Sequence, residues 1–137
     1  MLALLITTMA AASPISESPD VTLSGDYSFG NNVGAIGDVN GDGYDDVGVG
    51  DWEDGSISVY LGGPEHIAGG ADFYHRTYWT YGWSVTGADV NGDGYSDVVG
   101  GAYYANYDTG MLQAWFGGEA GMGSTDDVIW GEWLEYV

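Results

Sequence analysis

The sequence predicts an all-β fold made of repeated units, and three observations support this. The segments GDVNGDGYDDVGVG at 37–50 and ADVNGDGYSDVVGG at 88–101 nearly duplicate each other, with Asp38 and Asp89 51 residues apart. Apolar residues around both copies alternate with small or polar ones, as in β-strands. No stretch has a convincing helical period. Self-similarity at a period of about 50 residues is typical of solenoids, propellers and arrays.

The first unit contains two predicted strands after its loop. Val47 and Val49 alternate with glycines, and Ile57 and Val59 alternate with Ser56, Ser58 and Tyr60. This period of two indicates that each strand presents two different faces. The Gly-Gly pair at 62–63 is expected to end the second strand in a turn.

The second unit repeats this pattern: Leu112, Ala114 and Phe116 alternate with other residues, and a Gly-Gly pair follows at 117–118. Upstream of the loops, the copies differ in length. Five residues separate Val33 from Asp38, whereas four separate Val85 from Asp89. One strand is therefore expected to contain a β-bulge that keeps its faces in register.

The charge balance narrows the possible partners. Arg76 is the only Lys or Arg, against 21 Asp and Glu, so the formal net charge is -20. Nucleic acid binding requires a basic face and is excluded, and anionic membrane surfaces are disfavoured. The acidity favours cations and an extracellular or high-salt setting. The absence of Cys excludes disulfides, thiolate nucleophiles and thiolate zinc sites.

The duplicated loops present hard oxygen ligands at loop positions 1, 3, 5 and 9, with a backbone carbonyl at position 7. The candidate ligands are Asp38, Asn40, Asp42, the Tyr44 carbonyl and Asp46 in the first loop, and Asp89, Asn91, Asp93, the Tyr95 carbonyl and Asp97 in the second. Calcium prefers such a set, with glycine at position 6. The loops contain no His or Cys, which argues against zinc and copper. About two calcium ions are therefore expected.

The same loop residues have two other interpretations. An EF-hand would have a bidentate Glu at position 12 and continue into a helix, but Val49 and Gly100 occupy that position within strand-like sequence. A polar Asn-Gly-Asp-Gly turn without metal would also satisfy the residues. Three carboxylates within nine residues repel each other unless a cation is present, and this favours the metal site.

Through its paired acidic loops and the segments around them, the chain resembles the FG-GAP repeats of integrin alpha subunits and of many secreted microbial proteins. Phe29-Gly30 stands at the FG position and Tyr81-Gly82 is its conservative variant. Gly100-Gly101-Ala102 approximates the GAP segment, whereas the first copy departs from it with Val49-Gly50-Asp51. The resemblance implies four-stranded antiparallel blades of a β-propeller of about seven blades, with structural calcium in the hairpin loops.

The predicted organisation has four parts. Residues 1–13 resemble a signal peptide without its basic region. Residues 25–77 and 78–125 are the two FG-GAP repeats, and residues 126–137 resemble the start of a third. Two repeats cannot close a ring. The chain is therefore interpreted as the N-terminal piece of a propeller that further blades or self-association would complete.

The expected function is a secreted or cell-surface adhesion or recognition module with a protein or glycan ligand, without membrane insertion and without catalysis of its own. Two alternatives stay open. One is an accessory propeller of a secreted hydrolase, as in glycosylphosphatidylinositol-specific phospholipase D. The other is a carbohydrate-binding propeller whose exposed Trp52, Trp83 and Trp133 would stack on sugar rings.

Few other residues suggest chemistry. His66 and His75 lie in the less repetitive connection between the units and are expected to be solvated. No nucleophile-elbow motif is present. Asp51, Glu53 and Asp54 are expected to form a solvated turn, with an outer shell for the first ion as the alternative.

Overall fold

The computed structural model describes residues 19, 21–64, 67, 70–77, 80–105 and 109–123, which form two antiparallel sheets. The first sheet has the order β1-β2-β3-β4, with β1 at Asn32–Gly37, β2 at Asp46–Asp51, β3 at Ser56–Tyr60 and β4 at Phe73–Arg76. The second has the order β5-β6-β7, with β5 at Tyr81–Ala88, β6 at Asp97–Ala105 and β7 at Thr109–Trp115.

The described residues contain no helix, and in particular none that could cross a membrane. The all-β prediction is confirmed. The first sheet is four-stranded and antiparallel, as the propeller-blade prediction requires. The signal-like segment 1–13, the third-repeat segment 126–137, His66 and Trp133 lie outside the described residues.

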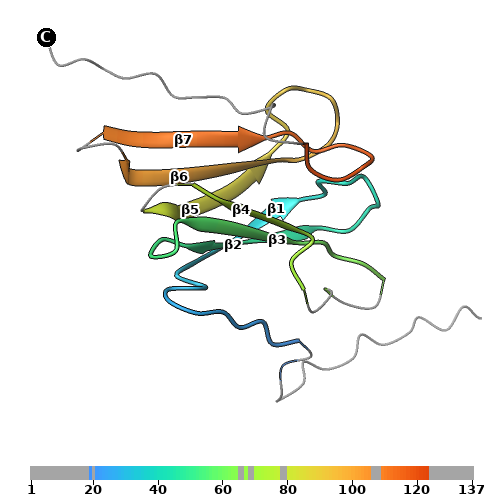
Figure 1. Ribbon diagram of the computed structural model, residues 1–137. Helices are drawn as coiled ribbons and strands as arrows, with labels where there is room; N and C mark the ends of the chain where they lie inside the picture. The colour runs from blue at the N-terminus through green and yellow to red at the C-terminus, as the bar shows by residue number, and fades with distance from the viewer. Residues whose placement is uncertain are drawn as a thin grey trace, which may run out of the picture.

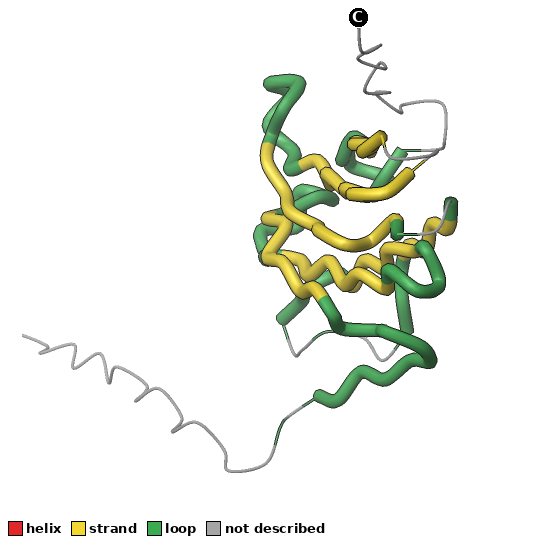
Figure 2. The backbone as a smooth tube through the Cα atoms, turned by 90° about the vertical axis from the view of Figure 1, so that its left-hand side faces the viewer, coloured by secondary structure: helices red, strands yellow, loops and turns green. Residues whose placement is uncertain are grey.

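The two sheets stack face to face, with β5–β7 above β1–β4 in Figure 1. Strand β5 packs against both β1 and β2. Figure 2 shows the strands of both sheets from the side, as successive layers. Strands β1, β2 and β3 correspond by the repeat to β5, β6 and β7. The sequence period is therefore a spatial period of one sheet, as expected of repeat architectures.

The predicted bulge lies in β1. Ala35 pairs with Val47 and Gly37 pairs with Asp46, so Ile36 is the extra residue between them. The corresponding part of β5 pairs with β6 without interruption. Gly37 has a φ of 73°, a backbone conformation that L-residues with a side chain seldom adopt. The bulge absorbs the additional residue of the first copy and keeps both loops in equivalent positions.

Glycines allow the two sheets to approach closely. A Cβ atom at Gly48 would lie 2.7 Å from Cγ2 of Val85, and one at Gly87 would collide with the backbone of Ile36. These glycines face the opposite sheet, and Val47 and Val49 point to the other side of β2. The predicted alternation in β2 is therefore present, with its small residues at the interface between the sheets.

The period of two also holds in β7, but its buried face differs from that of β3. Ile57 is fully buried, whereas the equivalent Leu112 is 50% exposed. Trp115 is fully buried and Gln113 nearly so. The difference arises because equivalent faces of the two sheets have different neighbours. The face that β3 turns toward the second sheet corresponds to the face that β7 turns away from the first.

The core lies between the sheets and contains one large aromatic group. The Trp115 ring centroid lies 4.9 Å from that of His75, 5.6 Å from that of Tyr81 and 6.2 Å from that of Phe73. The other fully buried core residues are Ile36, Val39, Ile57, Val59 and Val98. His75 is thus partly buried against aromatic rings, contrary to the expectation that it is solvated.

We predict that Gly87→Ala lowers the free energy of unfolding by about 1 to 3 kcal/mol, because overpacking forces a backbone shift. Urea denaturation measures the loss. Gly70→Ala is the matched control, since a Cβ atom there has no neighbour within 4 Å. Equal stability of Gly87→Ala and the wild-type chain would contradict the close packing of β5 on β1.

We also predict a pH dependence of stability from His75. Burial lowers the pKa of His75 below its usual 6.5, because desolvation disfavours the charged form. The unfolded chain then binds the proton more readily than the folded chain, so stability falls as the pH drops below 6.5 toward the folded pKa. Unfolding free energies between about pH 7 and pH 5 should show this decline.

His75→Phe is the control for this effect, since it keeps an aromatic ring and removes the titration. At pH values above those where carboxylates titrate, the decline in the free energy of unfolding should become shallower in the variant. An identical slope in both proteins would show that other groups cause it.

Candidate metal centre

The two acidic loops connect equivalent strands and lie side by side. Residues 38–45 join β1 to β2, and residues 89–96 join β5 to β6. The backbone N–H of Ser96 donates to the carbonyl of Asp38 at 2.9 Å. The Tyr95 ring lies against Gly41. Both loops therefore project from the same end of the stacked sheets.

The first aspartate of each loop shapes its turn. The Asp38 carboxylate accepts hydrogen bonds from the N–H groups of Gly41 at 2.6 Å, Asp42 at 3.1 Å and Gly43 at 2.8 Å. Such bonds between an ionised acceptor and backbone amides are strong. Gly41 and Gly43 have φ values of 77° and 90°, which explains the glycines at these positions.

The second loop repeats this turn bond for bond. The Asp89 carboxylate accepts from Gly92 at 2.7 Å, Asp93 at 3.2 Å and Gly94 at 3.0 Å. Gly92 and Gly94 have φ values of 81° and 93°. The two loops therefore share one local fold.

The middle of each loop is held by the Asn and the second Asp. Asn40 Nδ2 donates to Asp42 Oδ2 at 3.1 Å, and Tyr44 N–H donates to Asp42 Oδ1 at 3.0 Å. In the second loop the same bonds join Asn91, Asp93 and Tyr95, each at 2.9 Å. The candidate ligands at positions 1, 3 and 5 are thus gathered on one exposed turn.

The last aspartate of each loop has a second role that the sequence did not indicate. Asp46 is fully buried, and its two oxygens accept from Val39 N–H at 2.8 Å and Gly62 N–H at 2.7 Å. It therefore joins the loop to the turn after β3. The available sequence signal is the Gly-Gly pair, whose pattern indicates a turn but not its bond to Asp46.

Asp97 does the same in the second unit, where it is also fully buried. Its oxygens accept from Val90 N–H at 2.8 Å and Gly117 N–H at 2.9 Å. A Cβ atom at Gly117 would collide with the carbonyl of Ser96, so only glycine fits at this position. Each Gly-Gly turn is thereby fixed to the loop of its own sheet.

The electrostatics of the first loop reflect crowded carboxylates. Burial raises the pKa of Asp46, the amides of Val39 and Gly62 oppose this, and the charges of Asp42 and Asp38 raise it further, so the net shift is upward. At Asp38, desolvation acts to raise the pKa, but the backbone amides of the turn outweigh it and the net shift is downward.

The donor chemistry of the loops fits a hard cation. Among the described residues, no group of three or more His, Cys, Asp or Glu side chains is arranged to hold a metal ion. The loop carboxylates instead accept hydrogen bonds from backbone amides. The atoms that could coordinate a metal in these loops are nonetheless all oxygens. The negative charges of Asp42 and Asp38 raise the pKa of Asp46. A divalent cation would relieve this repulsion.

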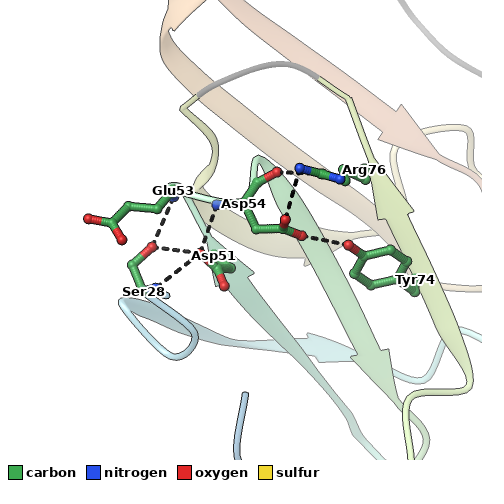
Figure 3. Close-up of polar contacts among 6 residues, drawn as sticks. All are labelled: Ser28, Asp51, Glu53, Asp54, Tyr74 and Arg76. Carbon is green, nitrogen blue, oxygen red and sulfur yellow. Dashed lines mark hydrogen bonds and ion pairs between the residues drawn. The ribbon is translucent and has the colours of Figure 1, made fainter. Parts of the chain in front are cut away.

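Asp51 is not in a solvated turn, contrary to the sequence prediction. It ends β2, is 6% exposed, and its Oδ1 accepts from Ser28 Oγ at 2.6 Å, Ser28 N–H at 3.3 Å and Asp54 N–H at 3.1 Å. Figure 3 shows these contacts, together with the ion pair between Asp54 and Arg76. The loop lies at the start of β2 and Asp51 at its end, so Asp51 is not placed to form an outer shell for a cation in the loop.

Ser28 and Thr80 are equivalent residues that the sequence analysis missed. Ser28 Oγ accepts from Glu53 N–H at 2.9 Å, and Thr80 Oγ1 accepts from Tyr104 N–H at 3.2 Å. Each precedes the FG or YG pair by one residue. A hydroxyl at this position in both copies was the available signal.

Of the three candidate tryptophans, the structure brings two together. The rings of Trp52 and Trp83 lie edge to face with centroids 5.9 Å apart. The ring centroids of Trp83 and Tyr103 lie 4.6 Å apart. Trp83 is 46% exposed and Tyr103 is 54% exposed. These three residues form an exposed aromatic patch.

Comparison with known proteins supports the family resemblance. Residues 81–115 match the family model described as FG-GAP repeat. The chain is 32% identical over 102 residues to integrin alpha-IIb of Homo sapiens, which covers 65% of this chain and 10% of the integrin. The resemblance to FG-GAP repeats is confirmed. The chain spans only about a tenth of this curated relative.

We predict that Asp46→Asn destabilises the fold by about 1 to 3 kcal/mol, because the amide replaces one acceptor with an N–H donor and leaves Val39 or Gly62 unpaired. Chemical denaturation with a chelator present isolates this effect from metal binding. Asp45→Asn is the matched control, since Asp45 directly precedes Asp46 and is exposed. Similar losses in both variants would argue against the bridging role of Asp46.

Proposed function

We propose that this chain is part of a calcium-stabilised FG-GAP propeller that acts as an adhesion or recognition module, secreted or on the cell surface. The observation that carries the proposal is the pair of identically folded acidic loops at one end of the stacked sheets. Both place two aspartates and an asparagine on a glycine turn, and a third aspartate, Asp46 or Asp97, follows at the start of the next strand. The similarity to an integrin alpha subunit supports the recognition role.

In this proposal each loop holds one calcium ion. The ligands would be Asp38, Asn40, Asp42, the Tyr44 carbonyl and Asp46 in one loop, and Asp89, Asn91, Asp93, the Tyr95 carbonyl and Asp97 in the other. The ion supplies positive charge that offsets the repulsion among the carboxylates. It would thereby rigidify the connection between neighbouring strands.

We further propose that additional sheets of the same kind complete the propeller, either from the same chain or from a second copy. Val99 and Gly101 occupy the outer face of β6, at positions equivalent to the interface residues Gly48 and Gly50. Leu112, which is 50% exposed, lies on the same face, and Trp83 lines a shared hollow with Gly101 and Leu112. The repeat therefore predicts that another sheet packs there, as the second packs on the first.

Calcium titration tests the metal sites. We expect isothermal titration of the chelator-treated chain to show about two sites. The double variant Asp42→Ala/Asp93→Ala should lose both, whereas Asp45→Asn should keep them. Intact binding in the double variant would show that the ligand assignment is wrong.

Calcium should also stabilise the fold. The midpoint of thermal unfolding is expected to rise with calcium as RT ln(1 + [L]/Kd) requires, because the ion binds the folded loops. The double variant should show no such rise. A midpoint that is independent of calcium in the wild-type chain would refute the coupling.

The calcium-loaded chain is expected to have no catalysis of its own, since one Arg, two His and no Lys or Cys offer few means of activating a nucleophile. Assays with ester, phosphodiester and glycoside substrates test this. Calcium-dependent turnover that disappears in Asp42→Ala/Asp93→Ala would overturn the recognition role. Saturable binding to a matrix protein without turnover would support it.

A further inference from the structure

The chain contains two Asn-Gly pairs, Asn40-Gly41 and Asn91-Gly92, and both lie in the acidic loops. In such a pair the backbone nitrogen of glycine can attack the side-chain amide carbon of asparagine, because glycine has no Cβ atom to hinder the approach. Asn40 is half-buried and the other three residues are exposed, so water reaches both pairs. Each pair therefore has the composition and the exposure of a site of spontaneous deamidation.

The folded first loop holds the reacting groups apart. The N–H of Gly41 points at Asp38 Oδ1, to which it donates at 2.6 Å. The Asn40 amide is turned toward Asp42 instead: its Oδ1 accepts from the backbone N–H at 3.1 Å, and its Nδ2 donates to Oδ2 at 3.1 Å. Attack of the Gly41 nitrogen on the Asn40 amide carbon requires these bonds to open. The rate of reaction is therefore proportional to the population of the open loop.

The second loop has the same protecting bonds. The N–H of Gly92 donates to Asp89 Oδ1 at 2.7 Å. The Asn91 amide bonds twice to Asp93, through its Oδ1 and its Nδ2, each at 2.9 Å. The hydrogen bonds that must open are thus of the same kind and number in both loops.

The two loops differ in what covers the glycine. A Cβ atom at Gly41 would lie 2.5 Å from Cε1 of Tyr95, whereas one at Gly92 would have no neighbour within 4 Å among the described residues. The Tyr95 ring of the second loop therefore lies on the Asn-Gly pair of the first. Opening of the first loop must separate the pair from this ring, and opening of the second loop has no such cost.

We propose that Asn40 and Asn91 are sites of spontaneous deamidation, and that Asn91 reacts faster because the Tyr95 ring protects Asn40. The glycine nitrogen bonds to the asparagine Cγ, the Cγ–Nδ2 bond breaks, and the displaced proton leaves with the amide nitrogen as ammonia. Water then opens the cyclic imide. Cleavage between the glycine nitrogen and Cγ gives aspartate, and cleavage between that nitrogen and the backbone carbonyl gives isoaspartate.

The two products change the loop differently. Aspartate keeps the main chain but replaces the Nδ2 donor to Asp42 with a second negative oxygen, so residue 40 then repels Asp42. Isoaspartate adds a carbon atom to the main chain before Gly41. It thereby displaces the N–H groups of Gly41 and Asp42 from the Asp38 carboxylate, and these bonds shape the turn. Isoaspartate therefore removes the turn that carries the acidic side chains.

Incubation of the dilute, chelator-treated chain at mildly alkaline pH tests the proposal, because the glycine N–H must lose its proton. Tandem mass spectrometry of chymotryptic peptides follows the mass gain when the amide NH2 becomes OH and reports each site separately. The folded chain should be modified roughly 3- to 10-fold faster at Asn91 than at Asn40, the effect of part of one ring contact. Asn32, which precedes Val33, is the internal control and should stay unmodified.

Tyr95→Ala tests the protecting ring. The variant should raise the rate at Asn40 to that at Asn91 and leave Asn91 unchanged. A variant that has lost its fold would instead react faster at both sites, so the Asn91 rate separates the two cases. Tyr103→Ala is the matched control, because it removes an exposed tyrosine near the opposite end of β6 and should change neither rate.

The chain unfolded in urea should react faster than the folded chain, with equal rates at the two sites. A folded chain that reacts at Asn40 as fast as at Asn91 would overturn the role of Tyr95. Equal rates in the folded and unfolded chains would show that the loop bonds do not protect the pairs. Modification confined to the unfolded chain would overturn the proposal for the folded protein. Because every sample contains chelator, these outcomes are independent of the calcium sites proposed above.

Discussion

A carboxylate buried in this chain can rarely be paired with a basic side chain, because Arg76 is the one Lys or Arg among 137 residues. Backbone amides take the place of counter-charges. The fully buried Asp46 and Asp97 each bond to two of them, and the nearly buried Asp51 bonds to two amides and a hydroxyl. Because an unpaired buried charge is very costly, these bonds fix where the loops, the turns and the N-terminal segment lie relative to the strands.

The close contact of the sheets follows from residue size and fixes the position of the loops. Gly34 and Gly48 on one sheet and Gly87 on the other remove the side chains that would hold the backbones apart. The sheets then approach until Val85 fills the space beside Gly48. This packing brings Ser96 within hydrogen-bonding distance of the Asp38 carbonyl, so the two loops support each other across the sheets.

Much of the fold could be predicted from the sequence, because the repeat appears in its local pattern. The alternating strands that follow each loop, the equivalence of the loops and the presence of a bulge in one copy follow from spacing, whereas the position of the bulge at Ile36 does not. The role of Asp46 could not be predicted, since its partners Val39 and Gly62 are backbone groups whose proximity depends on tertiary packing. The exposure of Leu112 and the burial of Asp51 could not be predicted for a similar reason: the local pattern does not show which other segment covers each face of a strand.

Strand β2 connects the acidic loop to a separate polar network and keeps the two apart. It begins at Asp46, which anchors the loop proposed to bind calcium, and ends at Asp51, which accepts hydrogen bonds from Ser28 and Asp54. The positions have opposite parity along the strand, so the two side chains project to opposite faces of the sheet. A cation in the loop would therefore act on the hydrogen bonds of Asp51 only through the rigidity of the strand. In this arrangement the acidic loop and the segment before β1 are held by different ends of one strand, and substitutions at either end can loosen one without releasing the other.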